Sequence, residues 1–122
     1  MSKVCVVDDD GVVLKIISGY LTDAGHDVIG VKDSSRISKT LKAETPDFVV
    51  TDLMMTPLDG LEVCKITRRL PKGSDIGVVV VSANQEKRAY WERISREHGA
   101  DVFLSKPFEA DDLIKALEQA KH

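Results

Sequence analysis

Five short apolar segments rich in β-branched residues alternate with stretches of helical periodicity, and this alternation constrains the fold more than any other feature of the sequence. Strands separated by helices predict a parallel sheet with helices on both faces. The fourth segment is apolar at almost every residue, as expected for a central strand. A chain of 122 residues suits one domain, so we expect a single α/β domain over 1–122. The segments are 4–7, 28–31, 48–51, 76–81 and 102–104.

The composition argues against several classes of function. Lys and Arg number 17 against 20 Asp and Glu, so no cationic excess indicates direct binding of nucleic acid or membranes. Residues 1–4 lead directly into the first strand, and no apolar run is long enough to span a membrane, so we expect a cytoplasmic protein. The two cysteines, Cys5 and Cys64, lie on a strand and a helix, which favours free core thiols over a disulfide or a zinc site.

Three consecutive carboxylates, Asp8, Asp9 and Asp10, follow the first strand directly. Two carboxylates about 4 Å apart repel by roughly 4 kcal/mol at an effective dielectric constant of about 20. A converging cluster therefore requires a cation, a shared proton, or side chains that point away from one another.

Polar residues also stand at the ends of the third, fourth and fifth strands. Asp52 ends the third strand, Ser82 the fourth, and Ser105-Lys106-Pro107 follows the fifth. The carboxyl ends of parallel strands meet at one edge of the sheet, where ligands bind in open α/β folds. We therefore expect carboxylates, a hydroxyl group and an ammonium group to converge there.

These motifs together resemble the receiver domain of two-component response regulators, the CheY-like family, over essentially the whole chain. The resemblance implies a flavodoxin-like, doubly wound (βα)5 fold whose five-stranded parallel sheet has the strand order 2-1-3-4-5. The motifs that carry the resemblance are Val7-Asp8-Asp9, Asp52-Leu53-Met54-Met55 followed by Asp59-Gly60, Ser82-Ala83, and Lys106-Pro107-Phe108.

The resemblance implies that Asp52 accepts a phosphoryl group from a histidine kinase or a histidine phosphotransfer protein, beside a bound Mg²⁺ ion. In this family Asp9, Asp52 and the backbone carbonyl of Met54 would ligate the metal directly, and Asp8 would act largely through water. Mg²⁺ prefers oxygen ligands and commonly uses one or two carboxylates together with phosphate oxygens. The protein would then be a signalling switch, not an enzyme, that catalyses only its own phosphorylation and dephosphorylation.

The resemblance also implies how the signal leaves the site. Lys106 would pair with the phosphoryl oxygens, and its peptide bond to Pro107 would be cis. Ser82 would donate a hydrogen bond to one of the phosphoryl oxygens. Movement of Ser82 would be coupled to a rotamer of Phe103, for which a plain core role is an equal alternative. A downstream protein would bind the face formed by the fourth helix, the fifth strand and the fifth helix.

The sequence departs from the family pattern at three places. Thr56 stands where the family commonly has proline, and Pro57 follows it. In a slightly longer segment, helical spacing places Tyr90 and Ile94 on one core-facing side. Trp91 is adjacent to Tyr90 and the two cannot both face the core, so we place Trp91 on the output surface, with a position at the core edge as the alternative. Met54 and Asn84 flank the path of attacking water in this family. Because Met54 cannot orient water, we expect a phosphoaspartate that is not among the shortest-lived.

Two other interpretations remain. Asp8-x-Asp10-Gly also resembles the signature of haloacid-dehalogenase-type phosphatases, with Asp8 as nucleophile and Asp10 as general acid and base. That alternative would use Ser82 and Lys106 to bind phosphate and Asp111-Asp112 to bind metal, but it leaves Asp52 without a role. The second alternative is a pseudo-receiver that never takes phosphate.

In the receiver interpretation Asp10 caps the first helix. The sequence also ends soon after the last helix, so we expect either action by protein binding alone or a piece of a larger protein.

Overall fold

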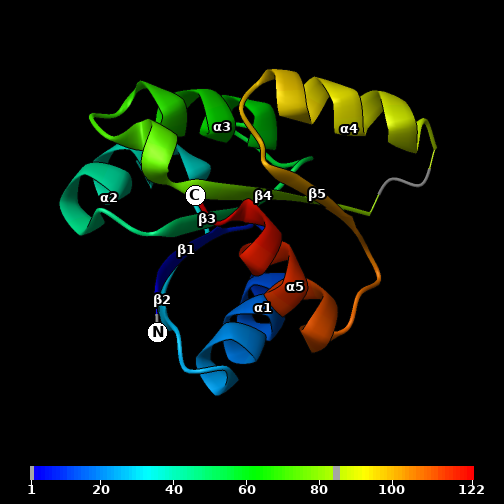
Figure 1. Cartoon of the computed structure of the whole chain (residues 1–122), viewed down its shortest axis with the longest axis horizontal. Coiled ribbons are helices and arrows are strands. Elements are labelled where there is room, and N and C mark those ends of the chain that lie inside the picture. The colour runs from blue at the N-terminus through cyan, green and yellow to red at the C-terminus, as the bar shows by residue number, and fades with distance from the viewer. Residues whose placement is uncertain (1, 84–85) are drawn as a thin grey trace.

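A computed structural model describes residues 2–83 and 86–122 and shows a five-stranded parallel sheet with helices on both faces (Figure 1). The strand order is β2-β1-β3-β4-β5, which confirms the predicted doubly wound topology. The strands are β1 (Lys3–Val7), β2 (Asp27–Val31), β3 (Phe48–Asp52), β4 (Gly77–Ser82) and β5 (Val102–Ser105).

The helices form two layers around the sheet (Figure 1). One face carries α1 (Gly11–Asp23) and α5 (Ala110–Ala120), and the other carries α2 (Ile37–Glu44), α3 (Gly60–Arg69) and α4 (Arg88–Glu97). Two short 3-10 helices, η1 (Ser34–Arg36) and η2 (Gly73–Asp75), precede α2 and β4.

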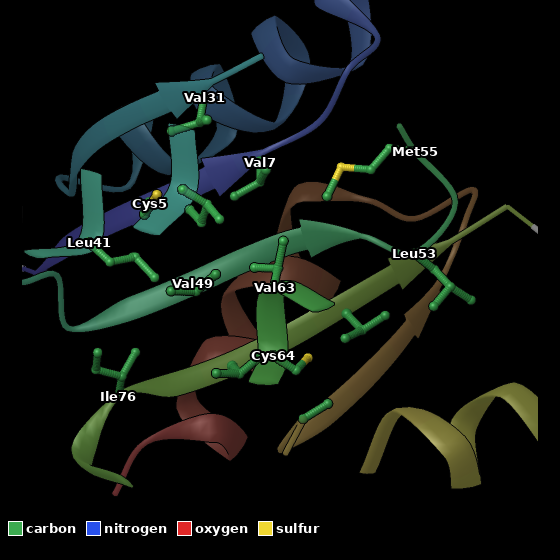
Figure 2. Packing of buried hydrophobic residues seen from close by; sticks show 14 of the residues in the cluster. Cys5, Val7, Val31, Leu41, Val49, Leu53, Met55, Val63, Cys64 and Ile76 are labelled. Carbon is green, nitrogen blue, oxygen red and sulfur yellow. The ribbon is translucent and has the colours of Figure 1, made fainter. Parts of the chain in front are cut away.

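Alternation of side chains along the strands divides the core into two clusters. In β1, Val4 and Val6 pack with the α1 and α5 layer, whereas Cys5 and Val7 pack with the opposite layer. Figure 2 shows this second cluster, in which Cys64 of α3 lies over the sheet. Both thiols are free and buried, and burial raises the pKa of each to about 12. The interpretation of the two cysteines as core residues is therefore confirmed.

Helix α4 differs from the sequence-based expectation. We expected Tyr90 to share a core-facing side with Ile94, but Tyr90 is 45% exposed and Trp91 packs against the core cluster. The spacing of Trp91, Ile94, Ser95 and His98 follows one helical stripe, and Tyr90 falls beside it. Of the described side chains of α4, that of Ser95 alone is fully buried, with 0% exposure. This helix is therefore anchored by little apolar burial.

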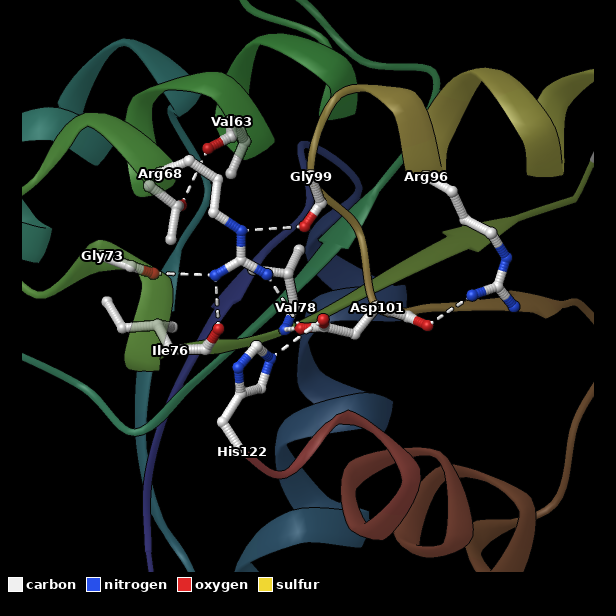
Figure 3. Close-up of polar contacts among 10 residues, drawn as sticks. Val63, Arg68, Gly73, Ile76, Val78, Arg96, Gly99, Asp101 and His122 are labelled. Carbon is white, nitrogen blue, oxygen red and sulfur yellow. Dashed lines mark hydrogen bonds and ion pairs between the residues drawn. The ribbon is translucent and has the colours of Figure 1, made fainter.

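A polar network ties the amino-terminal ends of β4 and β5 to α3 (Figure 3). The guanidinium group of Arg68 donates to the carbonyl oxygens of Gly99, Gly73 and Ile76 at 2.9, 2.7 and 2.6 Å, and to Asp101 Oδ2 at 2.8 Å. Asp101 Oδ2 also accepts the amide of Val78 in β4 at 2.8 Å. One side chain thus joins three segments at the end of the sheet opposite the acidic residues.

Candidate functional site

Three carboxylates converge at the carboxyl ends of β1 and β3. Asp8, Asp9 and Asp52 each offer an oxygen atom within 4.8 Å of the others. The two strands are neighbours and Val7 pairs with Thr51, so the residues that follow lie side by side. Asp8 is buried, Asp52 is partly buried and Asp9 is exposed. This part of the predicted convergence is confirmed.

Lys106 brings a positive charge into this cluster from the loop after β5. Its Nζ lies 3.2 Å from Asp52 Oδ1 and 3.6 Å from Asp8 Oδ2. The backbone amide of Lys106 donates to the carbonyl oxygen of Ser82 at 2.8 Å, which fixes the loop against the end of β4. The peptide bond from Lys106 to Pro107 is cis, as the resemblance implied.

Burial dominates the electrostatics of the cluster. It raises the pKa of the Asp8 carboxyl group, and the Asp10 amide and the Lys106 ammonium group offset this only in part. Burial likewise raises the pKa of Asp52, where Lys106 acts in the opposite direction and Asp8 and Asp9 add to the rise. One ammonium group is therefore too little to neutralise three carboxylates.

The residues of the cluster fit a small divalent cation. Asp8 Oδ2 is buried and has no hydrogen-bond partner among the described residues, although the Lys106 ammonium group lies near it. The donor atoms are carboxylate oxygens, the ligands that Mg²⁺ prefers, and a divalent charge would relieve their mutual repulsion. The structure thus supports a metal site of Asp8, Asp9 and Asp52; ligation by the Met54 carbonyl stays a prediction.

The Asp10 carboxylate takes no part in the cluster. Its Oδ1 accepts the amides of Val12 and Val13 at 2.9 and 3.3 Å, so it caps α1, as the receiver interpretation predicts. The phosphatase interpretation requires this carboxylate to face a substrate as the general acid and base. It also requires Asp111 and Asp112 as metal ligands, but these lie exposed in the first turn of α5. The geometry therefore disfavours that alternative.

The two residues of the predicted switch, Ser82 and Phe103, are both buried. Ser82 ends β4 with 1% exposure, one residue beyond the pairing of Asp52 with Val81. Phe103 of β5 is 5% exposed and belongs to the core cluster on the α2, α3 and α4 side. Their movement on phosphorylation stays a prediction. Asn84, predicted to flank the path of water, lies outside the described residues.

The loop from β3 to α3 supplies contacts that the sequence did not predict. The amide of Thr56 donates to Asp9 Oδ2 at 3.3 Å, and the amide of Leu58 donates to Ser34 Oγ at 2.9 Å. The displaced proline, which leaves an amide hydrogen at Thr56, is the signal that could have indicated the first contact. Nothing in the sequence marks Ser34, since its partner lies 24 residues away.

Residues 4–118 match the family model described as the response regulator receiver domain. The chain belongs to this family. Receiver domains are signalling components of two-component systems that act with histidine kinases, and they are not enzymes of metabolism. The family membership and the geometry of Asp8, Asp9 and Asp52 together identify this edge of the sheet as the functional site of a receiver domain.

Curated relatives are identical to this receiver domain at about a third of the aligned residues. The regulatory protein VirG of Agrobacterium fabrum is 34% identical over 120 residues, which are 98% of this chain and 46% of VirG. The alkaline phosphatase synthesis transcriptional regulatory protein PhoP of Bacillus subtilis is 32% identical over 118 residues, or 94% of this chain and 48% of PhoP. The chain therefore spans about half the length of the curated relatives that it matches.

Solved structures confirm the receiver fold. The receiver domain of the Francisella response regulator 1452 is 27% identical with a TM-score of 0.84, and the alignment covers 98% of this chain and 97% of that one. The chemotaxis response regulator CheY4 of Vibrio cholerae has a TM-score of 0.89 at 24% identity, with 98% of each chain covered.

Within the described residues, the helices are too short or too polar to cross a membrane.

Proposed function

We propose that this receiver domain is a phosphorylation-controlled switch whose phosphoacceptor is Asp52. The phosphoryl group would come from a phosphohistidine of a histidine kinase or a histidine phosphotransfer protein. The observation that carries the proposal is the position of Asp52, partly buried at the end of β3, with Asp8 and Asp9 beside it and Lys106 at 3.2 Å. Family membership makes a histidine kinase the expected donor.

The proposed transfer assigns a role to each charged group. An oxygen of the Asp52 carboxylate forms the bond to phosphorus, the phosphorus–nitrogen bond breaks, and the donor imidazole keeps the electron pair. Asp8, Asp9 and Asp52 would hold Mg²⁺ with the Met54 carbonyl, and the ion would supply neutralisation of charge on the phosphoryl oxygens. Lys106, now beside Asp52, would pair with the phosphoryl group, and Ser82 would donate a hydrogen bond to it.

The proposed output surface is the face formed by α4, β5 and α5, where a downstream protein would bind. Helix α4 is the natural moving part because it buries little apolar surface, and Phe103 would couple Ser82 to this face. Trp91 packs at the core edge, whereas Tyr90 is exposed, stacks edge-on against Trp91 and lies under Arg93. Although Trp91 packs at the core edge, we propose that it contributes to the output surface. Unchanged partner affinity in a folded Trp91→Ala variant would remove it from this surface.

The test is the mass of the intact chain after incubation with acetyl phosphate, with and without Mg²⁺. The proposal predicts one added phosphoryl group that requires Mg²⁺ and is absent in Asp52→Asn. Asp10→Asn is the matched control, because Asn also caps helices and Asp10 lies outside the cluster. An adduct that persists in Asp52→Asn but is lost in Asp8→Asn would favour the phosphatase interpretation, in which Asp8 is the nucleophile. No adduct on any variant would favour a pseudo-receiver.

A further inference from the structure

The loop between β3 and α3, residues 53–59, is anchored firmly at both ends. The amide of Gly60 donates to the carbonyl oxygen of Leu53 at 2.9 Å. A Cβ atom at Gly60 would overlap the carbonyl oxygen of Asp52, so α3 starts in direct contact with the backbone of the proposed phosphoacceptor. Leu53 and Met55 are 1% and 7% exposed and hold the first half of the loop in the core.

Two hydrogen bonds hold the middle of this loop to distant segments. Thr56 donates its amide hydrogen to Asp9 Oδ2, and Leu58 donates its amide hydrogen to the hydroxyl oxygen of Ser34. Ser34 is 0% exposed, and its helix η1 is fixed by Asp33, whose side chain accepts the amide and the hydroxyl group of Ser35. A buried hydroxyl group thus sets the position of the loop that contacts Asp9.

The contact with Thr56 restrains the orientation of the Asp9 carboxylate. Asp9 is exposed, and the hydrogen bond from the Thr56 amide to its Oδ2 restrains rotation of the carboxylate while lone pairs remain for a cation. Ligand carboxylates are commonly held by such outer hydrogen bonds, which orient them and raise metal affinity. A proline at this position has no amide hydrogen and could not make the bond.

We propose that Thr56 is a positioning residue for the metal site through its backbone amide, and that Ser34 supports it by holding the loop at Leu58. This inference rests on the proposed Mg²⁺ site. Loss of an outer hydrogen bond typically lowers metal affinity by about 10-fold to 100-fold. At 3.3 Å the bond from Thr56 to Asp9 is long, so we expect the lower end of that range.

The first experiment measures Mg²⁺ affinity by isothermal titration calorimetry, with the Thr56 amide resonance followed by NMR. Thr56→Pro removes the amide hydrogen, and Thr56→Ala keeps it while removing the side chain. We expect Thr56→Pro to bind Mg²⁺ about tenfold more weakly than Thr56→Ala. Mg²⁺ should also shift the Thr56 amide resonance of the unmodified chain. Equal affinities in the two folded variants would overturn the role of the amide.

Substitution of two buried serines distinguishes a role in positioning the loop from a general effect on stability. Ser34→Ala leaves the Leu58 amide without its acceptor, whereas Ser95→Ala removes a fully buried hydroxyl group on α4 that has no partner among the described residues. We expect Ser34→Ala to lower Mg²⁺ affinity several-fold relative to Ser95→Ala. Urea unfolding curves should show that both variants are folded in the absence of urea. Equal affinity in this pair would overturn the role of Ser34. If Thr56→Pro does not fold, a Thr56 amide resonance that Mg²⁺ leaves unshifted in the unmodified chain would overturn the role of the amide.

The outcomes also separate this inference from the proposed function. If the unmodified chain binds Mg²⁺ and Asp9→Asn does not, the metal site exists, and the Thr56 and Ser34 variants then test the positioning role alone. If the unmodified chain does not bind Mg²⁺, the proposed site fails, and the inference fails with it.

Discussion

Crowding of carboxylates around Asp8 predicts that Asp8→Asn stabilises the metal-free chain at neutral pH. Asp8 is 1% exposed and shares the cluster with Asp9 and Asp52, whose ligand oxygens lie within 4.8 Å of its own. At an effective dielectric constant of about 20, each of these repulsions is worth about 3.5 kcal/mol, and the attraction of Lys106 at 3.6 Å about 4.6 kcal/mol. The balance is a net repulsion of about 2 kcal/mol, before the cost of burying the charge is added.

The substitution removes the charge but keeps the shape. The side-chain oxygen of Asn can still accept the Asp10 amide, which now donates to Asp8 Oδ1 at 2.9 Å. Water at the open edge of the site screens part of the repulsion, so we expect the free energy of unfolding to rise by about 1 to 2 kcal/mol at pH 7.

The stabilisation should depend on pH in a defined direction. The pKa of Asp8 is raised above its ordinary value of 3.8, so between 3.8 and the raised pKa the folded chain binds more protons than the unfolded chain. Stability of the unmodified chain therefore falls as the pH rises through this window. The advantage of Asp8→Asn should shrink as the pH falls toward 3.8, because the carboxyl group of the unmodified chain becomes neutral.

The assay is urea unfolding in the presence of EDTA at several pH values. Asp27→Asn, which removes an exposed carboxylate at the start of β2, is the control and should change the free energy of unfolding by less than about 0.5 kcal/mol. A chain with Asp8→Asn that is no more stable than the unmodified one at pH 7 would refute the electrostatic account of the cluster, as would an advantage that does not shrink in acid.

Three further predictions concern the backbone of the site, the polar network and the lifetime of the phosphoryl group. Gly60→Ala should cost about 2 kcal/mol of stability by overlap with backbone, whereas Gly19→Ala, with nothing within 4 Å, should gain about 0.5 kcal/mol; thermal melting compares them, and equal melting temperatures would contradict the clash. Arg68→Lys should lose about 2 kcal/mol in urea unfolding, because one ammonium group cannot serve four acceptors; a loss under about 0.5 kcal/mol would contradict this. Met54→Asn should shorten the life of the phosphorylated chain, since the exposed thioether cannot orient water and an amide can; an unchanged decay rate of the adduct would refute the role of Met54.

The architecture and the acid cluster were predictable because both depend on local patterns. Apolar segments separated by helices require a parallel sheet, and a parallel sheet places all carboxyl ends of its strands at one edge. The strand order, which makes β1 and β3 neighbours, came from the resemblance to receiver domains, and the approach of Asp8, Asp9 and Asp52 followed from that order. The cis bond before Pro107 came from the resemblance, and it is present.

Contacts between distant segments were not predictable in the same way. The bond from Leu58 to Ser34 joins residues 24 positions apart, and Arg68 reaches Gly99 over 31 positions. Their partners include backbone groups, which carry no sequence signal. The predicted orientation of Tyr90 was wrong. Two adjacent aromatic residues fit either of two neighbouring helical stripes, and in the structure Trp91 packs against the core while Tyr90 is exposed.

The central claim is that Asp52 is the residue that takes the phosphoryl group. The most direct measurement is reduction of the acetyl-phosphate-treated chain with borohydride, which converts an aspartyl phosphate to homoserine, followed by peptide mass mapping. The account predicts homoserine at position 52 alone, and only when Mg²⁺ was present during the reaction. Homoserine at position 8, or at neither position in a folded chain with Mg²⁺ present, would contradict it.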